Sequence, residues 1–224
     1  MAAAIEHLVT KGTFSLDGGT WDVDNNVWIV GNDSEVIVID PAHDPEAIAE
    51  AVNGREVKAI LLTHGHDDHV AAVRDFAHRV GNPPVHLNPE DRVLWDMTYE
   101  DYQPDREITD GDTFSIDSVR LKALHTPGHS PGSTCFFIET GLPVPDSAGA
   151  GAAVGPVLFS GDTLFNGGPG ATGRSYSSFE TIIESIRDTL FTLPEATIVL
   201  TGHGDATSIG AEKPNLDEWV KRGH

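Results

Sequence analysis

A short segment rich in histidine and aspartate constrains the fold of this chain more tightly than any other feature. The segment, residues 63–69 (Thr-His-Gly-His-Asp-Asp-His), follows the apolar run 57–62, which has the composition of a buried strand. Three imidazoles and two carboxylates so close together would repel one another and compete for hydrogen bonds in an ordinary core. A divalent cation resolves this conflict, because neutral imidazole and carboxylate oxygen are both good ligands. We therefore predict a metal site at the carboxyl end of this strand.

Three later segments have the same character, since each follows an apolar run and ends in a polar turn that contains glycine. They are residues 125–133, 159–165 and 201–205, and each contains a histidine or an aspartate. Glycine lets the backbone approach a crowded centre closely. These segments contain no cysteine, which disfavours a structural zinc finger, whereas sites of His and Asp typically keep a position for water and are catalytic. The four segments together predict one shared metal site.

The rest of the chain alternates short apolar runs with stretches of helical spacing. Several runs are apolar throughout, which favours sheets covered on both faces. Two facing sheets with outer helices would bury this pattern within a single domain, residues 1–224. The Gly-, Ala- and Pro-rich stretch 141–156 is interpreted as a lengthened loop between two strands of one sheet. Besides 57–62, we expect strands at 28–30, 36–39, 85–87, 114–116, 119–124, 134–138, 157–159 and 197–200. We expect helices at 45–53, 70–80, 89–95, 178–190 and 215–221.

The composition limits the partners of the protein. Lys plus Arg is 14 and Asp plus Glu is 35, which gives a formal net charge of −21 over 224 residues. Such a surface repels phosphate backbones and anionic lipid, so nucleic acid and membrane partners are disfavoured, and no apolar run reaches the roughly 18 residues of a membrane span. The single cysteine, Cys135, is expected to pack inside a strand and cannot form an intrachain disulfide. The first residues lack the pattern of a secretory signal, so a cytoplasmic protein is expected.

The order of the polar residues resembles the metal-binding pattern of the metallo-β-lactamase-fold superfamily. The resemblance extends from about residue 26 to residue 215. Within the superfamily the chain looks most like the glyoxalase II-type (hydroxyacylglutathione) hydrolases. Three segments carry this closer resemblance: Gly-Asp-Thr-Leu-Phe at 161–165, Gly-Arg at 173–174 and Thr-Ser-Ile-Gly-Ala-Glu at 207–212. The residues that match the metal-binding pattern are His64, His66, Asp68, His69, His129, Asp162 and His203.

The resemblance implies an α+β fold, the αββα sandwich of two mixed β-sheets flanked by helices, with the metal site along one edge. It also implies two divalent metal ions per chain, for which zinc is expected and iron or manganese are alternatives. The ligands implied for the first ion are His64, His66 and His129. Those implied for the second are Asp68, His69 and His203, with Asp162 bridging the two ions.

The resemblance further implies roles for residues around the metal ions. Asp40, at the end of the run 36–39, resembles a residue that orients a ligand histidine, and a turn aspartate before Pro41 is an equal alternative. Asp68 is expected to orient the attacking hydroxide as a catalytic residue. Arg174 and Tyr176 match positions that contact the thiol part of the substrate in glyoxalase II-like proteins. Anchoring of their loop is the alternative role for both.

The function implied is hydrolysis of a thioester by a metal-bound hydroxide. Two ions can share a water and lower its pKa, so no serine or cysteine nucleophile is required. A thiolate leaves readily because thiols have pKa values of about 8.5. The expected substrate is a small S-acyl or S-2-hydroxyacyl thiol. Only 21 residues follow His203, so the C-terminal helical domain that completes the glutathione site of longer relatives is not expected, which leaves the thiol carrier open.

Alternative functions share the same pattern. Persulfide dioxygenases of this fold hold one iron through positions that match His64, His129 and Asp162. A lactonase would use the dinuclear chemistry on an ester. The acidic balance disfavours an RNA-processing nuclease. Antibiotic hydrolysis is also disfavoured, because Asp162 stands where one major class of β-lactamases has a cysteine ligand. The acyl group, the metal identity and assembly into a homo-oligomer remain open.

Overall fold

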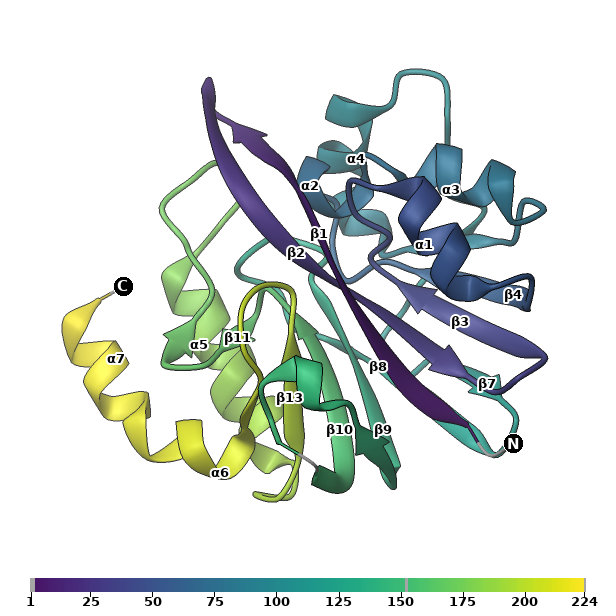
Figure 1. The fold of residues 1–224 in the computed structure, drawn as a ribbon. Helices are drawn as coiled ribbons and strands as arrows, with labels where there is room; N and C mark the ends of the chain where they lie inside the picture. The colour runs from purple at the N-terminus through teal and green to yellow at the C-terminus, as the bar shows by residue number, and fades with distance from the viewer. Residues whose placement is uncertain (1–2, 152, 224) are drawn as a thin grey trace.

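Two mixed β-sheets face each other and helices cover their outer faces. The computed structural model describes residues 3–151 and 153–223. Figure 1 shows helices α1–α4 gathered on one side of the molecule and α5–α7 on the other, with the sheets between them. The αββα sandwich expected from the sequence is therefore the observed fold. Within the described residues, no helix is long and apolar enough to cross a membrane.

The first sheet combines an antiparallel hairpin with parallel strands. The turn of the hairpin is Asp17-Gly18, where both residues have positive φ (53° and 77°), as a tight hairpin turn requires. The sequence analysis found only the end of the second strand, residues 28–30, because the outer half of the hairpin is largely exposed and lacks an apolar run. In spatial order the strands are β1 (Ala4–Leu16), β2 (Gly19–Gly31), β3 (Glu35–Ile39), β4 (Glu56–Leu61), β5 (Val85–Leu87) and β6 (Arg106–Glu107).

The second sheet is mostly antiparallel, with one parallel pair, β10 and β13. Half of the stretch 141–156, which was expected to be a loop, is strand: β9 and β10 stay paired as far as Val144 and Ala153, so the connection is shorter than predicted. In spatial order the strands are β14 (Thr207–Ser208), β13 (Ile198–Thr201), β10 (Ala153–Gly161), β9 (Thr134–Val144), β8 (Val119–His125) and β7 (Thr113–Ile116). A separate small hairpin is formed by β11 (Leu164–Phe165) and β12 (Gly168–Pro169).

The helices begin where the sequence supplies capping residues. The Asp44 side chain accepts a hydrogen bond from the N–H of Ala47 at the start of α1, and the Ser178 side chain accepts one from Thr181 at the start of α5. Against the first sheet lie α1 (Pro45–Val52), α2 (Asp67–Val70), α3 (Val73–Arg79) and α4 (Arg92–Thr98). Against the second lie α5 (Phe179–Asp188), α6 (Ile209–Glu212) and α7 (Leu216–Arg222). Single 3-10 turns are η1 (Pro89–Asp91), η2 (Asp146–Ala148), η3 (Leu190–Thr192) and η4 (Lys213–Asn215).

The helix expected over residues 70–80 is two short helices, α2 and α3, and it starts three residues earlier than predicted. The carbonyl of His66 accepts hydrogen bonds from the N–H groups of His69 (3.0 Å) and Val70 (3.1 Å), which closes the first turn. Asp67 and Asp68 occupy this turn, where negative charge is favoured by the exposed N–H groups. The early start brings Asp68 and His69 onto a helical turn instead of a loop.

Three apolar layers hold the sandwich together. The central layer lies between the sheets and includes Phe136 and Phe159, which are fully buried. The outer layers pack α1, α3 and α4 against the first sheet, and α5 and α7 against the second. Because the central layer joins two sheets that each carry part of the site, its packing fixes their separation.

Replacing Phe136 by alanine should strongly destabilise the protein. Phe136 is 0% exposed in the central layer, and removing a buried Phe side chain costs about 3–5 kcal/mol of the free energy of unfolding. Val154, 74% exposed on β10, supplies the control, since Val154→Ala should change stability by no more than about 0.5 kcal/mol. Urea unfolding measures both variants. Equal effects would contradict the assignment of Phe136 to the core.

Candidate metal centre

The polar segments meet at one edge of the sandwich because their strands run in the same direction. Strands β3 and β4 are parallel, as are β10 and β13, and β8 is antiparallel to β9, which is itself antiparallel to β10. Backbone hydrogen bonds join the two sheets there, from Thr134 N–H to the Thr63 carbonyl (2.8 Å) and from Asn26 N–H to the Gly202 carbonyl (2.8 Å). The carboxyl ends of these strands therefore place the predicted site residues next to one another.

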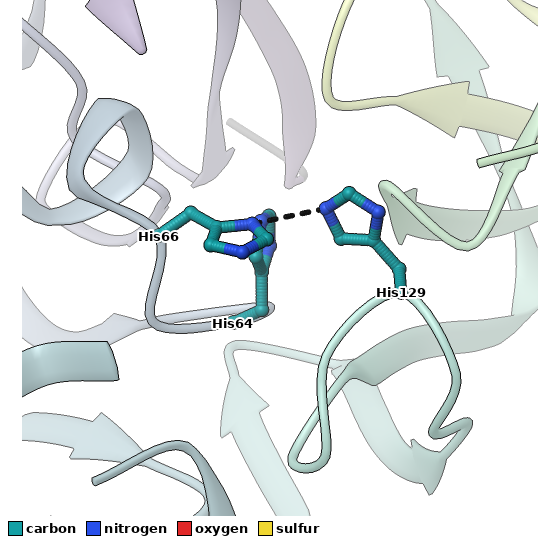
Figure 2. Close-up of side chains that lie close together, drawn as sticks. All are labelled: His64, His66 and His129. Atoms are coloured by element: carbon teal, nitrogen blue, oxygen red, sulfur yellow. Dashed lines mark hydrogen bonds between the residues drawn. The ribbon is translucent and has the colours of Figure 1, made fainter. Parts of the chain in front are cut away.

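Three histidines form a first group, which Figure 2 shows in close-up. His64 and His66 extend from one loop after β4, and His129 faces them from the loop between β8 and β9. His66 Nδ1 and His129 Nε2 are hydrogen-bonded at 3.0 Å. One nitrogen from each residue lies within 4.8 Å of the others, and all three residues are buried. This spacing suits a single metal ion.

A second group consists of Asp68, His69 and His203. Asp68 Oδ2 lies 3.3 Å from His203 Nε2 and 3.5 Å from His69 Nε2. The two imidazole Nε2 atoms are 3.3 Å apart. These three residues also place one ligand atom each within 4.8 Å of one another.

Asp162 lies between the two groups. Its Oδ2 is 3.6 Å from His129 Nε2 in the first group and 3.4 Å from His203 Nε2 in the second. Its Oδ1 is 3.5 Å from His69 Nε2. The structure thus brings together all seven residues of the predicted pattern, with Asp162 in a position to contact ions held by either group.

Hydrogen bonds from behind fix the orientation of four imidazoles. In each the Nδ1–H donates to an oxygen outside the centre, so the Nε2 is the nitrogen that faces the centre and can take a metal ion once it is deprotonated. His66 differs, because its Nδ1 is the atom beside His129. The Nδ1 acceptors are Thr63 Oγ1 for His64, Asp40 Oδ2 for His69, the Ala171 carbonyl for His129 and the Asp24 carbonyl for His203.

Asp40 supports this arrangement at two points. Its carboxylate is 2% exposed and accepts hydrogen bonds from His69 Nδ1 (3.0 Å) and from the hydroxyl of Thr63 (2.6 Å). The Thr63 hydroxyl in turn accepts from His64 Nδ1 at 3.0 Å. Asp40 also turns the chain, with a positive φ of 49°. The two roles weighed for it from the sequence are both compatible with this geometry.

Unpaired buried atoms show that these residues fit metal ions. Of the seven buried side-chain N and O atoms without a hydrogen-bond partner among the described residues, four lie here. Such atoms normally cost about 1–3 kcal/mol each and are rare in folded proteins. Because they converge on one place and are imidazole nitrogens and carboxylate oxygens, divalent cations would satisfy them. The four atoms are His64 Nε2, His66 Nε2, Asp68 Oδ1 and Asp162 Oδ1.

The two groups differ in their protonation. Burial lowers the pKa of His66 to about 3, aided by the neighbouring His129, and burial likewise lowers the pKa of His64. Burial would also lower the pKa of His69, but the carboxylates of Asp68, Asp162 and Asp40 outweigh it and raise that pKa to about 9. In the same way Asp162 and Asp68 raise the pKa of His203 to about 11. The carboxylates of the centre therefore favour the protonated imidazolium form in the second group, whereas burial favours the neutral form of His64 and His66 in the first.

Glycines leave room for the Asp162 carboxylate. A Cβ on Gly202 would lie 2.2 Å from Asp162 Oδ1, and one on Gly170 would lie 1.7 Å from the Asp162 carbonyl oxygen. No side chain larger than hydrogen fits at either position without moving Asp162. Gly202 belongs to the predicted glycine-containing turn 201–205, whereas Gly170 lies outside the predicted turns.

Sequence analysis missed the residues that hold Asp68 from behind. Asn25 Nδ2 donates to Asp68 Oδ2 at 3.0 Å, and His43 Nε2 donates to Asn25 Oδ1 at 2.8 Å. Asn25 lies on β2 outside any motif, so no sequence signal indicated it. His43 therefore lies behind Asn25, one residue further from the centre than Asn25.

A cavity of about 200 Å³ opens above the centre. Arg174 lies in its wall, with the guanidinium carbon 3.8 Å from the ring centroid of Trp21 and 5.3 Å from that of Phe14. Tyr176 is 47% exposed and is not among the lining residues, so the structure does not bring it to the cavity. Besides the metal-binding candidates, the lining residues are Phe14, Trp21, Val23, Ala171 and Arg174.

The tip of the β1–β2 hairpin is tied to the loop that carries Arg174. Asp17 accepts hydrogen bonds from the hydroxyl (2.6 Å) and the N–H (3.0 Å) of Ser175. Ser15 N–H donates to Asp67 Oδ1 at 3.0 Å, which ties the hairpin to α2 as well. These contacts hold Phe14 and Trp21 over the centre.

An αββα sandwich with candidate His and Asp metal ligands along one edge places the chain among the metal-binding proteins of this fold. The chain belongs to the metallo-beta-lactamase superfamily, whose family model matches residues 20–203. It is 32% identical over 190 residues to the hydroxyacylglutathione hydrolase GloC of Haemophilus influenzae, covering 79% of this chain and 83% of that protein. It is also similar to TTHA1623 in a di-iron-bound form (30% identity, TM-score 0.68, 85% of this chain and 93% of that chain). A further similar structure is the BLEG-1 B3 metallo-beta-lactamase (28% identity, TM-score 0.71, 92% and 97%).

Metal binding should release protons at neutral pH. The histidines of the second group, His69 and His203, have pKa values of about 9 and about 11, above the working pH, so a metal ion must displace their protons. We expect a net release of protons when metal is loaded at pH 7, and an affinity that rises from pH 6 to pH 8 as proton competition weakens. Calorimetric titration with metal in buffers of different ionisation enthalpy measures this release. A heat of metal binding that does not depend on the ionisation enthalpy of the buffer would contradict proton release.

Proposed function

We propose that this protein is a dinuclear metal-dependent hydrolase that cleaves the thioester of a low-molecular-weight thiol. The observation that carries the proposal is the pair of three-residue ligand groups, with Asp162 between them. The first ion would be held by His64, His66 and His129. The second would be held by Asp68, His69 and His203, and Asp162 would contact both.

Bound divalent ions would supply an activated hydroxide and polarise the acyl carbonyl. Zinc is our first expectation. Iron and manganese remain alternatives, since imidazole and carboxylate ligands suit all three metals and TTHA1623 has a di-iron-bound form. GloC, a hydroxyacylglutathione hydrolase, supports a thioester as the substrate class. The acidic surface and the small cavity support a small-molecule substrate over nucleic acid or membrane.

Asp68 is proposed to orient the attacking water as well as to hold metal. Its Oδ2 is fixed by Asn25, while its Oδ1 is buried without a partner and can accept a hydrogen bond. Burial would raise the pKa of Asp68, but the neighbouring His69 and His203 outweigh it and lower that pKa to about 2, so the carboxylate stays ionised. An Asp68→Asn variant that kept both metals and full turnover would contradict this role.

The cavity wall suggests how a thioester lies in the site. Phe14, Trp21 and Val23 offer an apolar surface for the acyl chain or the methylene groups of the thiol. Arg174 places one cation at this surface, where it can pair with a carboxylate of the substrate. The thiolate needs no protonating side chain because thiols have pKa values of about 8.5. Tyr176 has no part in this proposal.

A substrate panel tests the reaction. Purified protein should hydrolyse S-acyl and S-2-hydroxyacyl thioesters faster than the matching esters, lactones and a β-lactam. A thiol reagent measures thioester cleavage, and titration of the acid formed measures cleavage of every substrate on one scale. The persulfide dioxygenase alternative predicts oxygen uptake with a persulfide substrate. Oxygen uptake without thioester cleavage would overturn the proposed function.

Removing the cation of the cavity wall should weaken binding of carboxylate-bearing thioesters. Arg174→Gln should raise their KM about tenfold, as expected for loss of a hydrogen bond to a charged group worth about 1.5 kcal/mol, while kcat changes little. Thioesters without a carboxylate should be affected less. Arg120, which lines a different cavity, supplies the control through Arg120→Gln. A uniform loss of kcat for every substrate would indicate instead that Arg174 anchors its loop.

A further inference from the structure

A buried carboxylate bridges the two loops that carry the three-histidine group. Asp91 ends η1 and is 0% exposed. Its Oδ2 accepts hydrogen bonds from the Gly65 N–H (2.8 Å) and the Ser130 hydroxyl (2.7 Å). Its Oδ1 accepts one from the Gly132 N–H (2.5 Å). These donors are neutral, and they belong to loops that extend from different sheets.

The donors lie next to the histidines in the sequence. Gly65 separates His64 from His66, and Ser130 directly follows His129. A shift of Asp91 would therefore move both loops, and with them His66 and His129. The Nδ1 of His66 and the Nε2 of His129 are 3.0 Å apart. Within the described part of the chain, the side-chain hydrogen bonds of Asp91 reach no residue of the second group, Asp68, His69 and His203.

The packing around Asp91 leaves little freedom for its position. A Cβ on Gly65 would lie 2.8 Å from the Asp91 carbonyl oxygen, and one on Gly132 would lie 2.7 Å from the Asp91 nitrogen. Both loops thus press against the backbone of Asp91. Behind it, α4 is anchored by Trp95, which is fully buried in the outer apolar layer. Asp91 is held rigidly enough to set the separation of the two loops.

We propose that Asp91 is a positioning residue that sets the distance between His66 and His129 and thereby the metal affinity of the three-histidine group. This inference rests on the proposed metal centre but not on the thioester reaction. Residues that support metal ligands from behind typically change metal affinity about 10- to 100-fold when mutated. The effect should be confined to the three-histidine group, because among the described residues the side-chain hydrogen bonds of Asp91 go to the two loops of that group.

Cobalt titration in two parent variants tests this selectivity. In a His203→Ala parent the three-histidine group is intact, and Asp91→Asn should weaken cobalt binding about 10- to 100-fold in chelator competition. It should also alter the visible absorption of the bound cobalt. In a His66→Ala parent only the second group is intact, and there Asp91→Asn should change affinity by less than about threefold.

Two further variants separate positioning from stability. Ser130→Ala removes one of the three hydrogen bonds and should weaken binding in the same parent, by a smaller factor, even if Asp91→Asn does not fold. Glu212 is a matched control: it is 3% exposed, and its carboxylate accepts hydrogen bonds from Gly167 N–H (3.1 Å) and the Thr207 hydroxyl (2.6 Å). Glu212→Gln should destabilise the fold without changing cobalt affinity in the His203→Ala parent.

The outcomes distinguish this inference from the proposed function. Equal losses of affinity in both parents, or an equal loss with Glu212→Gln, would show that Asp91 only stabilises the fold and would overturn the inference. Unchanged affinity in the His203→Ala parent would overturn it as well, while leaving the metal centre standing. Parents and wild-type protein that bind no cobalt would contradict the metal centre itself, and the positioning role with it.

Discussion

The carboxylate of Asp162 lies between two clusters of imidazoles, and the geometry of the centre depends on it. Its two oxygens approach histidines of both groups at 3.4–3.6 Å. Burial would raise the pKa of this carboxyl, but the neighbouring His203 and His69 outweigh it and hold that pKa well below its usual range. A permanent negative charge at this point offsets the positive charge that metal ions or protonated histidines bring to a buried site.

The sandwich supports this charge by bringing strand ends together. Each sheet supplies part of the centre, and backbone hydrogen bonds such as that from Thr134 to Thr63 join the sheets at the same edge. Behind the imidazoles stand oxygen acceptors that fix which nitrogen carries the proton, with Asp40 serving both His69 and Thr63. Asp91 extends this support to the backbone of two loops. Rigid apolar layers therefore determine the placement of very polar groups.

The sequence predicted the parts of the structure that leave local patterns. The segment 63–69 and the glycine-containing turns stand out because so many ligand types follow apolar runs, and the family resemblance that they carry implied the fold class. Strand β1 was missed since its exposed half has no apolar run, although Asp17-Gly18 was a usable hairpin signal. The apolar part of the cavity wall was missed with it, because Phe14 and Trp21 lie on that hairpin, whereas Arg174 was predicted and lies in the wall. Asn25 and Asp91 act through tertiary contacts between distant segments, which no local pattern encodes.

The number of metal ions per chain tests the central claim most directly. Elemental analysis should be made on protein purified without added metal or chelator. The arrangement of two ligand groups around Asp162 predicts about two divalent ions per chain, with zinc expected first. About one iron per chain, with little other metal, would contradict a dinuclear hydrolase and favour the mononuclear dioxygenase.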